Sequence, residues 1–283
     1  MKFGIMFANT GPFVEPEAAI NLAQAAEAAG CESIWTVEHV VVPKGYKSAY
    51  PYAKDGRMPG DKEDIDIPDP LIWLAYIASA TSTIKLGTGV MIVPQRNPLV
   101  TAKAVATLDR LSKGRMILGV GSGWLEEEFD ALGVSFDDRG NRTDEYLQTY
   151  RAAWENDVAG FNGEFISFND VYVRPQPSSH HIPIIVGGHS KRAARRAGEI
   201  GDGFFPGRGK PSELAVLFNY AKECAERAGR NPDALEFTAG GPTTAEYVEQ
   251  LASIGVSRMI VPPLQPEQFD SFASNVITQF GSS

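Results

Sequence analysis

Residues 84–121, IKLGTGVMIVPQRNPLVTAKAVATLDRLSKGRMILGVG, contain two apolar segments separated by a helical one. The apolar segments, 84–93 and 115–121, have the nearly continuous hydrophobic character that is typical of strands buried on both faces of a parallel sheet. The segment between them, 97–114, predicts a helix that begins after Asn97 as its N-cap, with a proline in its first turn. This order of strand, helix and strand indicates an α/β protein.

The same alternation continues along the chain on both sides of this unit. Eight segments are predicted as strands, at 2–7, 33–37, 84–93, 115–121, 182–188, 202–206, 235–240 and 257–263. Predicted helices lie at 15–30, 70–81, 97–114, 124–132, 141–156, 190–200, 211–228, 244–254 and 266–280. Eight strand–helix units in 283 residues predict a TIM (β/α)8 barrel that forms one domain over residues 1–283. A doubly wound open sheet is the alternative, and the even distribution of the units favours the barrel.

A longer insertion separates the fourth and fifth predicted strands. Within it, residues 161–175, FNGEFISFNDVYVRP, predict a β-hairpin with Asn162-Gly163 as its turn. Because this hairpin interrupts the regular spacing, we expect it to be an addition to the barrel.

Composition and charge exclude several classes of function. A net charge of −9 and a pI near 5.0 disfavour nucleic-acid binding. The two cysteines, Cys31 and Cys224, lack CxxC spacing, which favours a reducing cytoplasm. The apolar run at the N-terminus is too short for a signal peptide or a membrane span. We therefore expect a cytoplasmic protein that acts on a small molecule.

Polar or glycine-rich residues occur where several predicted strands end. They are Asn9 and Thr10, Glu38 and His39, Gly89 and Val90, Gly121 to Gly123, and Gly187 to Ser190. The active site of a TIM barrel lies at these C-terminal strand ends, so we expect these residues to surround one mouth. A structural role for the isolated His39 is the competing interpretation. A metal site is disfavoured, because His39 has no second ligand near it in the sequence, and His180 and His181 precede a strand.

The segment GGHSKRAARR, residues 187–196, predicts a turn followed by a helix that Ser190 caps. Amide groups and the dipole at a helix start favour an anion, and glycines allow close approach to the backbone. This segment predicts a phosphate site, with a basic solvent-exposed face as the alternative. The segment GVGSGW, residues 119–124, lacks the final glycine of a dinucleotide-binding motif and instead suggests close approach to a flat ligand.

Taken together, the sequence resembles the luciferase-like monooxygenase superfamily, in particular its coenzyme F-420-dependent oxidoreductase branch. The segments that carry the resemblance are IWTVEHV (34–40), the stretch 84–124, and PIIVGGHSKRAARRAGEIGDGFFP (183–206), with additions from 142–146 and 168–177. The resemblance covers essentially the whole chain. It implies a homodimer and a cofactor that is coenzyme F-420, with FMN as the alternative.

The resemblance also assigns expected cofactor contacts. The positions concerned are Gly89, Val90, Ser122, Gly123, Gly187, Gly188, His189 and Ser190. Gly89-Val90 corresponds to a bulge with a non-proline cis peptide that supports the cofactor ring. Gly187 and Gly188 correspond to the loop that holds the cofactor phosphate, in agreement with the helix-start argument.

For catalysis, the resemblance implies that His39 donates or accepts a proton beside the cofactor ring, and that Glu38 orients or electrostatically tunes it. Asn9 and Trp124 are the expected substrate contacts. The glucose-6-phosphate dehydrogenases of this branch have a glutamate where this chain has Trp124, so a sugar phosphate is not implied and a less polar substrate is expected.

The predicted function is hydride transfer between coenzyme F-420 and a small organic substrate. The alternatives are an FMN-dependent two-component monooxygenase and a non-catalytic flavin or deazaflavin carrier. The loop 43–70, which contains Tyr46, Tyr50 and Tyr52, is predicted either as a lid or as a solvated loop. The cations Lys191, Arg192 and Arg208 indicate a basic groove for an acidic cofactor tail.

Overall fold

The structure, a computed structural model, describes residues 1–58 and 63–281. Its main sheet has the strand order β3-β2-β1-β11-β10-β9-β8-β5-β4, and β3 also pairs with β5, so the sheet closes into a barrel of parallel strands. The strands are β1 (Lys2–Ile5), β2 (Ser33–Thr36), β3 (Lys85–Thr88), β4 (Met91–Ile92), β5 (Met116–Gly121), β8 (Ile184–Gly187), β9 (Gly203–Phe205), β10 (Glu236–Gly240) and β11 (Val256–Val261). The predicted TIM barrel is confirmed.

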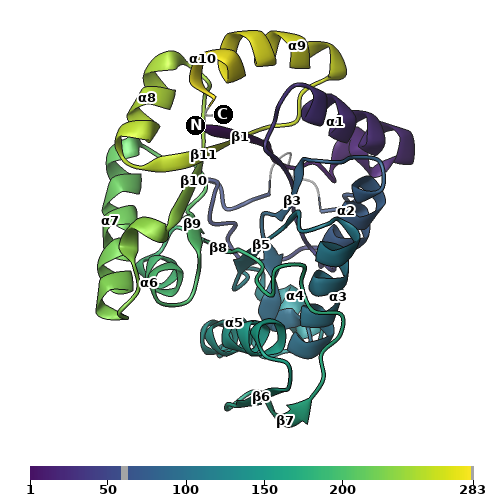
Figure 1. Cartoon of the computed structure of the whole chain (residues 1–283), viewed down its shortest axis with the longest axis vertical. Helices are drawn as coiled ribbons and strands as arrows, with labels where there is room; N and C mark the ends of the chain where they lie inside the picture. Colours follow the sequence, from purple (N-terminus) through teal and green to yellow (C-terminus); the bar gives the residue numbers. More distant parts are fainter. Residues whose placement is uncertain (59–62, 282–283) are drawn as a thin grey trace.

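Helices surround the barrel, as Figure 1 shows. They are α1 (Pro16–Ala28), α2 (Pro70–Ala78), α3 (Pro98–Leu111), α4 (Glu126–Ala131), α5 (Arg139–Glu155), α6 (Lys191–Glu199), α7 (Pro211–Arg227), α8 (Ala245–Ser253), α9 (Phe269–Phe272) and α10 (Thr278–Phe280). Side-chain caps begin three of them, because Asp69, Asn97 and Ser190 accept backbone N–H groups of the first turn. Every helix in the described residues is too short or too polar to cross a membrane.

Two predicted elements differ from the structure. The strand 84–93 is divided into β3 and β4 by a cis peptide bond between Gly89 and Val90. The last predicted helix, 266–280, is a series of short 3-10, α and π segments. The cis peptide itself agrees with the expectation from the family resemblance.

The inserted hairpin is present, as β6 (Ala159–Asn162) and β7 (Ser167–Val171), but its predicted turn is wrong. Asn162 pairs with Ser167 in the ladder, and the loop between them spans residues 163–166. The carboxylate of Glu145 on α5 accepts N–H groups from three consecutive residues, 164–166. A tertiary contact therefore satisfies the amides of this wider loop.

The interior of the barrel is filled, so that only its ends are available for a site. Trp35 lies across the interior with Ile117, Ile185, Phe205 and Ile260. A Cβ atom at Gly87 would overlap the Trp35 ring, which explains why glycine occupies that position in β3. At the N-terminal end of the strands, the buried Arg258 forms ion pairs with Glu32 and Glu236.

Candidate active site

Val90 joins three loops at the C-terminal end of the barrel. A Cβ atom at Gly121 or at Gly187 would lie 2.6 Å from a methyl group of Val90. These glycines come from β5 and β8, so residues at the ends of three strands meet at one place. Val90, Gly121 and Gly187 together form a surface, the glycine cradle. It consists of backbone and one small side chain, which suits contact with a flat ring.

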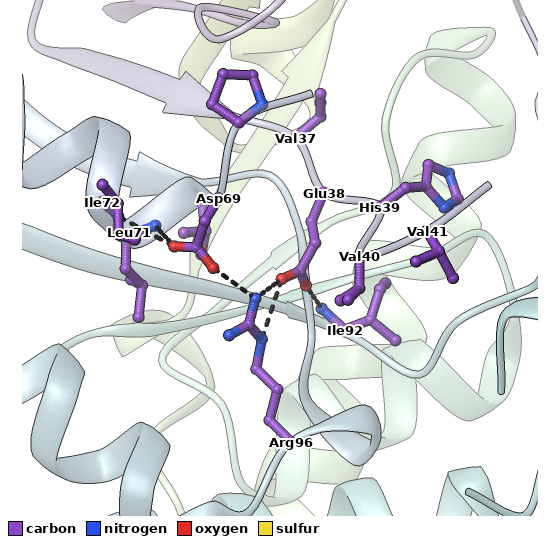
Figure 2. A network of polar contacts seen from close by, with 12 residues as sticks. Val37, Glu38, His39, Val40, Val41, Asp69, Leu71, Ile72, Ile92 and Arg96 are labelled. Atoms are coloured by element: carbon purple, nitrogen blue, oxygen red, sulfur yellow. Dashed lines mark hydrogen bonds and ion pairs between the residues drawn. The ribbon is translucent and has the colours of Figure 1, made fainter. Parts of the chain in front are cut away.

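Glu38, at the end of β2, is buried and belongs to a network of polar contacts (Figure 2). One carboxylate oxygen accepts the N–H of Ile92 at 2.5 Å, and the other pairs with the guanidinium of Arg96. Arg96 also contacts Asp69 at 3.0 Å, and Asp69 caps α2. Burial raises the pKa of Glu38 above its ordinary value, and the attraction of Arg96 opposes this increase only in part.

The prediction that Glu38 orients His39 is wrong. Figure 2 shows the two side chains leaving the backbone in different directions, with Glu38 directed at Arg96. Successive side chains of an extended backbone point to opposite sides, so neighbours in sequence do not share a contact surface here. Glu38 supports the backbone near the cis peptide through Ile92.

His39 is held by a segment that follows β5. Its Nδ1 lies 3.0 Å from Oε2 of Glu128, and its ring meets the Trp124 ring edge-on, with centroids 5.7 Å apart. The other oxygen of Glu128 accepts the N–H groups of Val40 at 2.6 Å and Val41 at 3.2 Å. Glu128 is 2% exposed. Glu128 was not among the site residues predicted from the sequence. The only pattern that pointed to it was the acidic triplet 126–128 directly after the glycine-rich segment.

Asn9 does not have the predicted substrate contact. Its side chain is fully buried and donates to the carbonyl oxygens of Val37 and Pro68, and it accepts the N–H of Val37. These bonds tie the loops after β1 and β2 together, and they leave no surface for a substrate.

Aromatic side chains of the loop after β2 extend from Trp124 to the loop after β8. Tyr46 and Tyr50 contact the Trp124 ring, with centroids 5.6 and 5.3 Å away. Tyr50 also contacts Tyr52, which lies 4.7 Å from His189. The predicted lid therefore packs over residues of two other strand ends, although its residues 59–62 lie outside the described part of the chain.

Helix α4 anchors this loop through Glu127. The Glu127 carboxylate accepts the N–H groups of Lys47 at 2.6 Å and Ser48 at 3.1 Å. Burial disfavours the charged form, but the hydrogen bonds from Lys47 and Ser48 outweigh it and lower the pKa of Glu127 to about 2. Adjacent glutamates of α4 thus hold the loop and His39 separately.

The predicted phosphate loop begins helix α6. Gly188 has a φ of 123°, and the Ser190 hydroxyl accepts the N–H of Ala193 at 3.2 Å. His189 bonds to the carbonyl of Arg208, and in the neighbouring loop Ser122 accepts a hydrogen bond from Thr143. A Cβ atom at Gly123 would meet Phe129, so a side chain is excluded there as well.

Most cations near this loop are already engaged. Arg195 and Arg196 both pair with Asp144, and the Lys191 ammonium lies over the Tyr220 ring at 5.5 Å. Arg192 has no hydrogen-bond or ion-pair partner among the described residues. The predicted basic groove is therefore smaller than the sequence indicated, because Lys191 faces helix α7.

Comparisons with known proteins agree with this geometry. Residues 1–261 match the family model described as luciferase-like monooxygenase. An uncharacterized protein of Mycobacterium tuberculosis is 32% identical over 92% of this chain and 94% of its own length. The F-420-dependent glucose-6-phosphate dehydrogenase of Amycolatopsis mediterranei is 30% identical over 79% of this chain and 63% of its own length.

Solved structures share the fold. The coenzyme F-420-dependent tetrahydromethanopterin reductase of Methanopyrus kandleri has a TM-score of 0.78 at 19% identity, with 99% of both chains covered. A monooxygenase of Streptomyces bottropensis has a TM-score of 0.66 at 23% identity, covering 99% of this chain and 79% of that one. The family model and the M. tuberculosis relative together establish the assignment. The chain belongs to the luciferase-like monooxygenase family.

Proposed function

We propose that this chain is an oxidoreductase that transfers a hydride between the deazaflavin coenzyme F-420 and a small organic substrate. The observation that carries the proposal is that His39 and the glycine cradle lie at the ends of adjoining strands of one barrel mouth. The names of the A. mediterranei dehydrogenase and the M. kandleri reductase support F-420 as the cofactor.

The residues at the mouth fit such a cofactor. A flat ring requires a surface without projecting side chains, and a Cβ atom at Gly121 or Gly187 would force Val90 to shift. The exposed amides at the start of α6, with the unpaired guanidinium of Arg192 among the described residues, suit a phosphate. When bound, the deazaflavin supplies a carbon that carries the hydride.

The side chains around the cradle have separable roles in this proposal. His39 gives or takes the proton that accompanies hydride transfer. Trp124 forms an apolar wall next to His39, which favours a substrate less polar than a sugar phosphate. The aromatic loop over Trp124 excludes water from the site.

An FMN-dependent two-component monooxygenase is the second candidate. The fold shared with the S. bottropensis monooxygenase favours it, and a cradle made of backbone does not distinguish between two tricyclic rings. A non-catalytic carrier is a weaker candidate, because such a protein has no need for an imidazole held in place by a buried carboxylate.

The test is a fluorescence titration of the apo-protein with coenzyme F-420 and, separately, with FMN. Tight binding of F-420 and weak binding of FMN is the expected result. The reverse would favour the monooxygenase, and binding of neither would overturn the proposal.

Two alanine variants sharpen this titration. Gly187→Ala places a Cβ atom 2.6 Å from Val90, so we expect at least about a tenfold loss of affinity. Gly140→Ala is the matched control, because its Cβ atom on helix α5 would meet only an Arg196 nitrogen at 3.8 Å. Equal binding by both variants would show that the cradle does not hold the cofactor.

A further inference from the structure

We propose that Glu128 is the positioning residue of His39, and that it holds the imidazole as the tautomer with hydrogen on Nδ1. Nε2 then remains as the atom that exchanges a proton. The role of Nε2 in a reaction rests on the proposed function, whereas the control of the tautomer stands on the geometry alone.

The hydrogen bonds of Glu128 define its role as an acceptor. Its Oε1 receives two backbone N–H groups, from Val40 and Val41, and these groups can only donate. Its Oε2 lies 3.0 Å from Nδ1 of His39. An ionised carboxylate has no hydrogen to give, so Nδ1 must supply the hydrogen of this contact.

The opposite side of the imidazole is open to chemistry. No described residue forms a hydrogen bond with Nε2 of His39, and the side chain keeps 11% of its surface exposed. The edge-on contact with Trp124 limits rotation of the ring. Since Trp124 and Glu128 both follow β5, one short segment determines the direction in which Nε2 points.

No other described acid shares this task. Glu38 is directed at Arg96 and Ile92, and Glu128 is the one acid among the described residues whose carboxylate contacts the His39 ring. A carboxylate that fixes the tautomer of a neighbouring histidine is a recurrent device of both metal sites and catalytic triads.

Glu127 provides a matched control within the same helical turn. Its carboxylate also accepts two backbone N–H groups, from Lys47 and Ser48, but it does not contact His39. Glu127→Gln and Glu128→Gln therefore remove the same charge and weaken the same kind of loop contact. Only Glu128→Gln alters the partner of Nδ1.

The experiment is two-bond ¹H–¹⁵N spectroscopy of the full chain labelled with ¹⁵N-histidine, in which His39→Gln assigns the His39 signals among four histidines. We expect the Nδ1–H tautomer in the unmodified protein and in Glu127→Gln. We expect the Nε2–H tautomer to appear in Glu128→Gln, and Glu128→Asp to restore part of the original signal.

Three outcomes would overturn the proposal. They are an Nε2–H tautomer in the unmodified protein, an unchanged His39 signal in Glu128→Gln, and equal changes in Glu127→Gln and Glu128→Gln. Circular dichroism establishes that each variant is folded. If Glu128→Gln does not fold, the His39 tautomer is compared between the unmodified protein and the milder variant Glu128→Asp. The spectra need no cofactor, so failure to bind F-420 would count against the proposed function while the tautomer result stands.

Discussion

Each end of the barrel contains an arginine between two carboxylates, and the two networks behave differently. At the N-terminal end, Arg258 pairs with Glu32 and Glu236, and Lys2 adds a second cation. At the mouth, Arg96 alone compensates two acids. The first network has balanced formal charge, whereas the second carries one surplus negative charge.

The two networks shift the pKa values of their glutamates in opposite directions, and the extent of burial explains why. The side chain of Glu38 is 1% exposed, compared with 24% for Glu32. Burial opposes the charged form in both, but Arg258 outweighs it and lowers the pKa of Glu32, whereas the pKa of Glu38 is raised. Similar side chains therefore form a charge-balanced network at the N-terminal end of the barrel and leave an unbalanced acid at the mouth, the end proposed to be functional.

The largest effect on stability is expected at the N-terminal end of the barrel. Arg258→Ala leaves Glu32 and Glu236 without their shared cation, so we expect a loss of about 3–5 kcal/mol in the free energy of unfolding. Urea denaturation followed by circular dichroism measures it, with the exposed Arg110→Ala as control. A loss below about 1 kcal/mol would show that this network does not stabilise the barrel.

At the mouth, substitution of His39 should affect the rate of hydride transfer more than the stability of the fold. His39→Ala removes the proposed proton donor or acceptor, and we expect hydride transfer to slow by about 10²-fold or more while cofactor affinity stays nearly unchanged. Stopped-flow absorbance of the deazaflavin measures the rate, and the fluorescence titration measures the affinity. Normal turnover by this variant would remove the catalytic assignment of His39.

The smallest expected effect concerns pH, and it has opposite signs at the two ends. Glu32 has a lowered pKa, so its contribution to stability is present above the unfolded pKa near 4.5 and is lost as pH falls. Glu38 has a raised pKa, so the folded chain binds the extra proton, and stability decreases as pH rises above about 4.5.

Two glutamine variants test these signs by urea denaturation from about pH 3 to about pH 7. The stability of the unmodified protein relative to Glu32→Gln should increase with pH. Its stability relative to Glu38→Gln should decrease with pH. If both stability differences changed with pH in the same direction, the pKa values of Glu32 and Glu38 would not be shifted in opposite directions.

Much of the fold was predictable from local patterns. Asn97 caps α3 and Ser190 caps α6 as expected, because a cap depends on residues two or three positions away. The hairpin turn was wrong at Asn162-Gly163 because Glu145, on a different element, binds the loop amides. Local rules thus succeeded where the partner was near in sequence and failed where it was distant.

The candidate site divides in the same way. Glycine and strand-end patterns located the cradle and His39, because parallel strands of a barrel must end at one mouth. The sequence by itself therefore determined the barrel, the family and the place of the candidate site. Only the tertiary structure decided that Asn9 is buried, that Glu38 turns to Arg96, and that Glu128, 89 residues from His39, holds the imidazole. The physical reason is that side-chain direction along an extended backbone separates sequence neighbours, while closure of the barrel brings distant loops into hydrogen-bond distance.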